Sequence, residues 1–272
     1  MLSTCTAFSA AVGYFLIQHH DNAGVLVPTI AVFLLASGAS ALNQIQEAAI
    51  DGRMKRTRLR PLPSGTLNKI QASGLSIALI ASGLLLLAFR GPSTAVALGL
   101  FALVWYNVIY TNLKKRTAFA SVPGALVGAV PPAIGWACAG GELFDVRLLL
   151  FCFVLFLWQV PHFWVLMFDH EDEYANAGIP CLTTVMSRAQ ASRIIFVWVS
   201  AAIAASLLLP LSGAIASLFV YAALFPAAAW VLWNVRTLLR GPSAPSHSAF
   251  RSINAYLFLV LALVSFEQVV LH

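Results

Sequence analysis

Charged residues are scarce in this sequence. Only 10% of its 272 residues are Asp, Glu, Lys or Arg, whereas 60% are hydrophobic, and the mean hydropathy is +0.85. This balance excludes an ordinary soluble domain, whose surface needs far more charge. It predicts an all-α integral membrane protein, because a helix satisfies its backbone hydrogen bonds internally within the bilayer.

Cysteine is also rare, and its spacing excludes two classes of site. The four cysteines are Cys5, Cys138, Cys152 and Cys181, and they form no C-x-x-C pair. Three of them lie in apolar segments, where cysteine behaves as a small buried hydrophobic residue. We therefore expect neither a disulfide nor a zinc site.

Long apolar runs fill most of the chain. A membrane-spanning helix needs about 20 apolar residues, and nine segments are candidates: roughly 3–18, 25–43, 70–89, 94–111, 119–139, 147–168, 193–210, 213–235 and 250–270. Residues 1–17 lack a basic stretch and a cleavage motif, so we expect the first span there rather than a secretory signal. The short connections predict a single transmembrane domain over residues 1–272.

Positive charge is unevenly distributed between the predicted loops. With the amino terminus in the cytoplasm and nine alternating spans, fourteen of the sixteen basic residues fall on the cytoplasmic side, and only Arg90 and Arg147 fall on the other. Positive charge gathers on the cytoplasmic side of membrane proteins. We therefore expect a multi-pass protein of the cell inner (plasma) membrane, whose partner is the lipid bilayer and not nucleic acid.

Six of the ten acidic residues lie in two short clusters, each at the end of an apolar run. In the first, Asn43, Glu47 and Asp51 are spaced i, i+4, i+8, which places them on one face of a helix. Carboxylate and amide oxygens are suitable ligands for Mg²⁺ shared with substrate phosphates. The alternative interpretation of this cluster is a solvated helix end with ordinary ion pairs and no ligand.

The second cluster, residues 169–173, repeats the four-residue spacing with Asp169 and Glu173. Taken alone, it also fits an ordinary acidic loop. Because the predicted topology puts both clusters on the cytoplasmic face, we expect them to converge on one site. The candidate catalytic and metal-binding residues are Asn43, Glu47, Asp51, Asp169 and Glu173.

Basic residues follow the first cluster directly and recur after the fourth apolar run. Arginine makes forked contacts with phosphate oxygens, and lysine supplies a point charge. The candidate diphosphate ligands are Arg56, Arg60, Lys114, Lys115 and Arg116. The alternative for these residues is attraction to anionic lipid headgroups. Acids at helical spacing beside this charge favour an enzyme acting on a lipid diphosphate.

Two polar residues interrupt the sixth apolar run. Gln159 and His162 lie inside the predicted span, where ionisable groups indicate function, and Pro161 is expected to kink the helix. His162 is predicted to bind substrate, to relay a proton or to hydrogen-bond a neighbouring helix; the sequence leaves these roles open. In the preceding run, Gly124-x-x-x-Gly128 predicts close helix packing.

Ordered motifs extend across the chain. One set comprises Asn43-x-x-x-Glu47-x-x-x-Asp51, Arg56-Thr57, Arg60-Pro61-Leu62 and Asp169-x-x-x-Glu173. Through it the chain resembles the UbiA superfamily of intramembrane prenyltransferases over roughly residues 10–270. A second set comprises Tyr110-Thr111, Lys114-Lys115-Arg116-Thr117, Pro131-Pro132-Ala133-Ile134-Gly135-Trp136, Leu157-Trp158-Gln159-Val160-Pro161-His162-Phe163-Trp164 and Tyr174-x-x-Ala177-Gly178-Ile179-Pro180. Through it the chain is similar to the protoheme IX farnesyltransferases (heme O synthases).

The resemblance implies a bundle of about nine transmembrane helices around a lipid-accessible cavity. It implies Mg²⁺ at the acidic positions, with Glu47 where the family usually has Asp. It also implies transfer of a farnesyl group from farnesyl diphosphate to a vinyl group of heme b, giving heme O and diphosphate. The acceptor-pocket candidates are His162, Trp158, Gln159, Tyr110 and Tyr174.

Two alternatives to heme farnesylation stay open. The extra acids of the second cluster are more typical of the aromatic prenyltransferases of the superfamily, so a quinone precursor is the alternative acceptor. A transporter is a third hypothesis, because Gln159 and His162 could line a pathway. Transporters tend to place their sites near the bilayer midplane between repeats, whereas here the charges gather at one surface.

Overall fold

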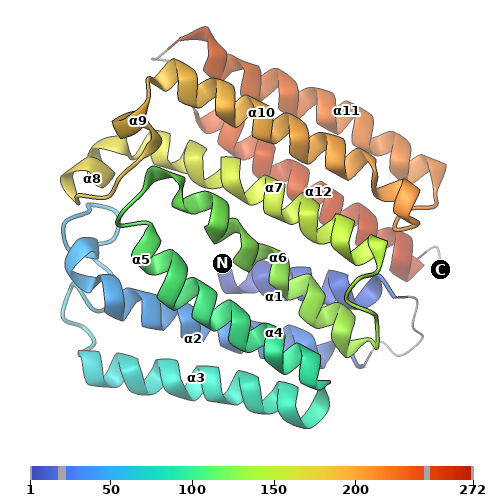
Figure 1. Cartoon of the computed structure of the whole chain (residues 1–272), viewed down its shortest axis with the longest axis horizontal. Helices are drawn as coiled ribbons and strands as arrows, with labels where there is room; N and C mark the ends of the chain where they lie inside the picture. The colour runs from blue at the N-terminus through green and yellow to red at the C-terminus, as the bar shows by residue number, and fades with distance from the viewer. Residues whose placement is uncertain (1, 18–22, 242–245, 271–272) are drawn as a thin grey trace.

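The computed structural model describes residues 2–17, 23–241 and 246–270, and within these ranges every regular element is helical (Figure 1). The first half of the chain contains α1 (Leu2–Phe15), α2 (Leu26–Asp51), α3 (Lys69–Arg90), α4 (Ser93–Val104), the π-helical turn η1 (Trp105–Tyr110), α5 (Thr111–Leu113), η2 (Ala118–Ala120) and α6 (Ser121–Cys138). The second half contains α7 (Val146–Asp169), α8 (Glu171–Asn176), α9 (Leu182–Val185), α10 (Arg188–Leu207), η3 (Leu209–Ser212), α11 (Leu218–Val235), η4 (Arg236–Arg240) and α12 (His247–Val270).

Eight helical segments of the described ranges are long and apolar enough to cross a membrane, which confirms an all-α membrane protein. Each corresponds to one of the predicted runs from the second onward. The first predicted run, 3–18, forms the 14-residue helix α1, and residue 18 lies outside the described residues. At 1.5 Å per residue, α1 rises only about 21 Å. It packs against α6 and α2 inside the bundle.

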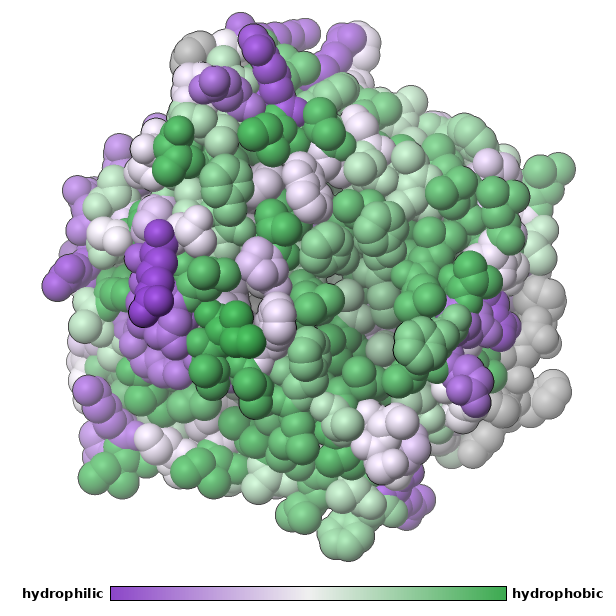
Figure 2. All heavy atoms as spheres, viewed as in Figure 1, coloured by the Kyte–Doolittle hydropathy of each residue, from purple (hydrophilic) through white to green (hydrophobic). Residues whose placement is uncertain are grey.

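The outer surface of the bundle is apolar. Large hydrophobic side chains such as Ile70 and Phe89 on α3 and Phe219 on α11 are about four-fifths exposed. Figure 2 shows hydrophobic residues across the middle of the visible face, with hydrophilic residues gathered towards its margins. In water such a surface would be unfavourable, whereas in lipid it needs no cover.

The long helices alternate in direction, so their ends form two groups. One end of the bundle collects the carboxyl ends of α2 and α7, the short helices α8 and α9, and the loop 52–68 (Figure 1). The two acidic clusters therefore lie at the same end, as predicted. Fourteen of the sixteen basic residues lie at or near helix ends on this side, and Arg90 and Arg147 lie at the other.

Glycines let α1 enter the bundle closely against α6. A Cβ atom at Gly135 would overlap the carbonyl oxygen of Ala10, and one at Gly13 would overlap the backbone of Pro132. The two backbones therefore touch, which only residues without a side chain permit. Buried residues of α1 and α6 belong to both major hydrophobic clusters, one with α2, α3 and α4 and the other with α7, α10, α11 and α12. The cavity of interest lies between these two clusters.

Candidate functional site

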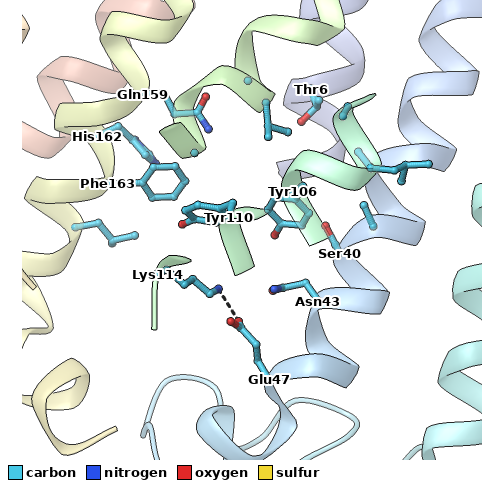
Figure 3. Close-up of a pocket in the computed structure, with 18 of the residues that line it drawn as sticks. Thr6, Ser40, Asn43, Glu47, Tyr106, Tyr110, Lys114, Gln159, His162 and Phe163 are labelled. Carbon is cyan, nitrogen blue, oxygen red and sulfur yellow. Dashed lines mark hydrogen bonds and ion pairs between the residues drawn. The ribbon is translucent and has the colours of Figure 1, made fainter. Parts of the chain in front are cut away.

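A cavity of about 400 Å³ lies among α2, the α4–η1 segment, α6 and α7. This volume is in the range of ligand pockets. Figure 3 shows Asn43 and Glu47 of α2 and Lys114 just after α5 below, and Gln159, His162 and the aromatic residues above. The cavity is lined by ten of the predicted site residues: Asn43, Glu47, Asp51, Arg56, Arg60, Tyr110, Lys114, Gln159, His162 and Tyr174.

The first acidic motif forms the polar floor of this cavity. Asn43, Glu47 and Asp51 lie along α2 and are each at most 7% exposed, as the helical spacing predicted. Glu47 Oε2 accepts from Lys114 Nζ at 2.6 Å (Figure 3), and Asp51 Oδ2 accepts from Arg60 Nη1 at 2.9 Å. Each buried carboxylate thus has one cationic partner, which offsets part of its desolvation.

The donor set on α2 also fits a divalent cation. Within the described residues, the second oxygen of Glu47, Oε1, is buried without a hydrogen-bond partner, which is costly for a carboxylate. Asn43 donates through Nδ2 to Thr111 Oγ1 at 3.0 Å, so its oxygen is the amide atom left to coordinate a metal. In the described part of the chain, no three His, Cys, Asp or Glu residues form a metal cluster. Mg²⁺ takes one or two carboxylates and completes its shell with water and phosphate oxygens, so Glu47 and Asp51 are a sufficient set of carboxylates.

The loop after α2 brings two arginines to the same place. Thr57 Oγ1 donates to the backbone oxygen of Asp51 at 2.9 Å, which folds the loop back over the helix end. Arg56 and Arg60 consequently line the cavity. The backbone N–H of Arg56 donates to Glu173 Oε2 at 3.2 Å, which ties this loop to α8.

The second acidic motif spans the end of one helix and the start of the next, so its four-residue spacing does not form a helical face. Helix α7 ends at Asp169, α8 begins at Glu171, and His170 between them has φ −131°. Because of this break, the side chains of Asp169 and Glu173 point in different directions. Asp169 instead accepts from Ser246 Oγ and lies 3.3 Å from His247 Nδ1, so it joins α7 to the start of α12. Neither Asp169 nor Glu173 lines the cavity.

The aromatic wall depends on the π-helical turn η1. Tyr106 and Tyr110 stack with ring centroids 5.7 Å apart, and both line the cavity. A Cβ at Gly124 would overlap the Tyr110 ring, and one at Gly128 would overlap the Gln159 amide. The predicted glycine pair on α6 thus makes room for cavity side chains. π-Helical turns are frequent at functional sites.

Three other predicted residues lie away from the cavity wall. Lys115 is half-buried and Arg116 is exposed, and neither lines the cavity. Trp158 is behind His162: its ring centroid lies 4.7 Å from that of the imidazole, and its Nε1 donates to the Ile253 oxygen at 3.0 Å. Lys114, Lys115 and Arg116 all follow the short helix α5 directly. Of these three residues, Lys114 points into the cavity and the other two do not.

Tyr174 closes the cavity near the arginines. Burial raises the pKa of its phenol above the usual range, and the nearby Arg56 guanidinium offsets part of the rise. A raised pKa keeps the phenol protonated at neutral pH. Tyr174 is therefore a hydrogen-bond donor beside Arg56 and Arg60.

Sequence reasoning left open whether Tyr106 faces the cavity and assigned no site role to Asn254. Tyr106 could have been found from its four-residue spacing to Tyr110. Asn254 Oδ1 lies 2.7 Å from His162 Nδ1. Its signal was a polar amide within an apolar span, the same signal that singled out Gln159.

Known proteins resemble this chain in sequence and in fold. The model of the UbiA prenyltransferase family matches residues 6–262. A protoheme IX farnesyltransferase of Geobacter sulfurreducens is 44% identical over 215 residues, which is 79% of each chain. Another, of Oleidesulfovibrio alaskensis, is 34% identical over 264 residues, covering 97% of this chain and 92% of the relative. The solved structure of a UbiA homolog from Archaeoglobus fulgidus bound to DMAPP and Mg²⁺ has a TM-score of 0.72 at 12% identity, covering 97% of this chain and 96% of that one.

Proposed function

We propose a function from one premise: the chain belongs to the UbiA prenyltransferase family. We infer that it transfers the farnesyl group of farnesyl diphosphate to a vinyl group of heme b and releases heme O and diphosphate. Relatives that are 44% and 34% identical over most of the chain carry the name protoheme IX farnesyltransferase, which supports heme b as the acceptor.

The amphipathic cavity is the observation that carries this proposal. One end presents buried carboxylates and an amide with Lys114, Arg56 and Arg60, and the rest is formed mostly by apolar and aromatic side chains, with a few polar ones such as Gln159. A prenyl diphosphate has the same division, an anionic head on a long apolar chain. A soluble diphosphate would gain nothing from the aromatic part, and a neutral lipid would leave the charges unused.

Mg²⁺ would be held at the polar end by Asn43, Glu47 and Asp51, and when bound it neutralises charge that develops on the departing diphosphate. The solved homolog bound to DMAPP and Mg²⁺ supports Mg²⁺ as the ion. Lys114, Arg56 and Arg60 bind the phosphate oxygens, and Tyr174 donates a hydrogen bond to them. We assign Asp169 and Glu173 to holding the surrounding loops rather than to the metal.

The apolar part of the cavity controls the fate of the farnesyl group. The π faces of Tyr106 and Tyr110 stabilise positive charge on the allylic carbon by cation–π attraction. The apolar wall excludes water while the carbon–oxygen bond to diphosphate breaks. The heme vinyl group attacks the allylic carbon, and one water then adds to the product cation to give the hydroxyl group of heme O. No strong protein nucleophile is required.

The distribution of basic residues supports a location in the inner (plasma) membrane with the polar end of the cavity facing the cytoplasm. Fourteen of the sixteen basic residues lie at that end, as the positive-inside tendency requires. Farnesyl diphosphate would enter from this side with its chain towards the lipid.

The decisive experiment supplies purified protein in detergent with farnesyl diphosphate and heme b and separates the heme products by chromatography. We expect heme O and diphosphate in equal amounts, and loss of both when EDTA removes Mg²⁺. Prenylation of a hydroxybenzoate-like acceptor without any heme product would contradict the proposal. Expression in a host that lacks its own heme O synthase repeats the test in a membrane.

A further inference from the structure

A residue of helix α12 determines which ring nitrogen of His162 carries the proton. The amide nitrogen of Asn254 donates to the backbone oxygen of Phe250 at 2.7 Å. A carbonyl oxygen only accepts, so this bond sets which way the amide faces. The oxygen of Asn254 therefore faces His162 Nδ1 at 2.7 Å, and Nδ1 must donate. In a neutral imidazole, the other nitrogen, Nε2, then carries the lone pair.

Packing leaves Nε2 as the reactive edge of this ring. The imidazole centroid lies 4.7 Å from that of Trp158, 5.1 Å from that of Phe250 and 5.4 Å from that of Phe163. Nδ1 is bonded to Asn254 and three aromatic rings pack around the imidazole, so the Nε2 edge is the candidate position for a ligand. His162 lines the cavity beside Gln159 and Phe163 (Figure 3).

Two consecutive residues of α12 hold this arrangement. Ile253 accepts from Trp158 Nε1 through its backbone oxygen, and Asn254 accepts from His162. Trp158 and His162 are one helical turn apart on α7, so the two bonds fix both the position and the rotation of the imidazole. Such an outer hydrogen bond is the usual means of orienting a histidine that binds a metal and of making it more basic.

We propose that Asn254 is a positioning residue that presents His162 Nε2 as an axial ligand to the iron of the porphyrin acceptor. The proposal rests on the proposed function, because heme b supplies the iron. A neutral imidazole nitrogen is a common axial ligand of heme iron. The bond anchors the porphyrin at its centre and leaves its vinyl edge free to meet the farnesyl group.

The test titrates the purified full-length protein with ferric heme b and, separately, with metal-free protoporphyrin. Absorption spectra report ligation, and a reductive titration reports the potential of the iron. The wild-type protein is expected to show a histidine-ligated Soret band and to bind heme more tightly than metal-free protoporphyrin. His162→Ala should lose both the band and the preference for iron.

Substitutions of Asn254 separate positioning from mere packing. Asn254→Leu should raise the Kd for heme by about tenfold, the lower end of the usual cost of losing such a bond. Asn254→Asp should keep the ligated spectrum and lower the reduction potential, because a charged acceptor makes the imidazole a stronger donor. Asn234→Leu on α11 is the matched control: Asn234 makes the same bond to the carbonyl four residues earlier, but that bond is exposed, whereas the bond of Asn254 is partly buried.

Two further measurements guard against misfolding. All variants should bind inorganic pyrophosphate with Mg²⁺ as the wild type does. His162→Gly should regain the histidine-ligated band when free imidazole is added. An unchanged spectrum and Kd in His162→Ala would overturn the iron-ligand proposal, even if heme O is still formed. Absence of heme O from the wild-type protein would instead overturn the proposed function.

Discussion

The acids of α2 and the acids at the end of α7 have the same four-residue spacing but different surroundings. Glu47 and Asp51 are buried, face the cavity and each pair with one cation from another segment. Asp169 faces the start of α12, and Glu173 accepts from a backbone N–H of the neighbouring loop. The first pair is placed for a ligand and the second pair for joining parts of the protein.

The difference arises from helix continuity. Helix α2 continues without interruption from Leu26 through Asp51, so the spacing becomes a face. The α7 helix stops at Asp169, so the same spacing straddles a turn. Spacing therefore indicates a metal site only where one helix carries all the ligands. Four substitutions, in descending order of expected effect, test this division.

Asp51→Asn should have the largest effect and lower turnover by about 1,000-fold, the upper range for loss of one group that stabilises transition-state charge. The change removes a proposed metal ligand and frees Arg60 from its ion pair. Heme O formation measured over a range of Mg²⁺ concentrations checks it. Asp145→Asn at the far end of the bundle is the control. Full activity of Asp51→Asn would refute a metal role for α2.

Lys114→Met should lower turnover by about 100-fold, within the range for removing one charge-stabilising donor. Lys114 pairs with Glu47 Oε2 and is a proposed ligand of the diphosphate. Because the acids remain, the Mg²⁺ dependence should stay close to that of the wild type. Steady-state rates with Lys69→Met, an exposed lysine at the same end, give the comparison. Equal rates for the two variants would remove Lys114 from the diphosphate site.

Glu173→Gln should raise the KM for farnesyl diphosphate by about tenfold, roughly the value of a hydrogen bond to a charged group. A neutral amide still accepts from the Arg56 backbone but holds the loop less firmly. The exposed neighbour substitution Asp172→Asn should leave KM unchanged. A loss as large as that of Asp51→Asn would mean that Glu173 binds the metal directly.

Asp169→Asn should have the smallest effect on catalysis, with turnover within about twofold of the wild type because Asp169 does not line the cavity. Its loss should instead weaken the contact with Ser246 and His247 and lower stability by about 1 kcal/mol. Thermal unfolding in detergent measures the second effect. Strong loss of turnover with unchanged stability would return Asp169 to the metal site.

Hydropathy predicts most helices closely, because each must supply about 20 apolar residues. The run 70–89 corresponds to Lys69–Arg90, and 147–168 corresponds to Val146–Asp169. The prediction 193–210 misses the polar first turn of α10, which begins at Arg188 after a capping box formed by Ser187 and Gln190. A capping box is local chemistry that an average over apolar residues cannot detect.

Many residues of the candidate site were predictable, but their relative placement was predictable from spacing only where one helix carries them. The face formed by Asn43, Glu47 and Asp51 follows from the period of α2 alone. The pairing of His162 with Asn254 joins residues 92 positions apart, and the contact of Asp169 with Ser246 joins residues 77 apart. Such contacts depend on how helices pack, which periodicity within one segment does not contain.

The π-helical turn at 105–110 also determines the direction, around the helix axis, of every side chain that follows it on the same helix. Each α-helical residue turns the chain by about 100°, so the wider turn changes where Lys114 points relative to Phe101 and its neighbours. Converting this segment into regular α-helix with the same number of residues would swing Lys114 about 100° around the axis, away from Glu47, whereas deleting one residue at the same time would restore its direction. The ammonium group of Lys114 thus reaches the carboxylate of Glu47 because the helix contains one extra residue in the turn before Lys114.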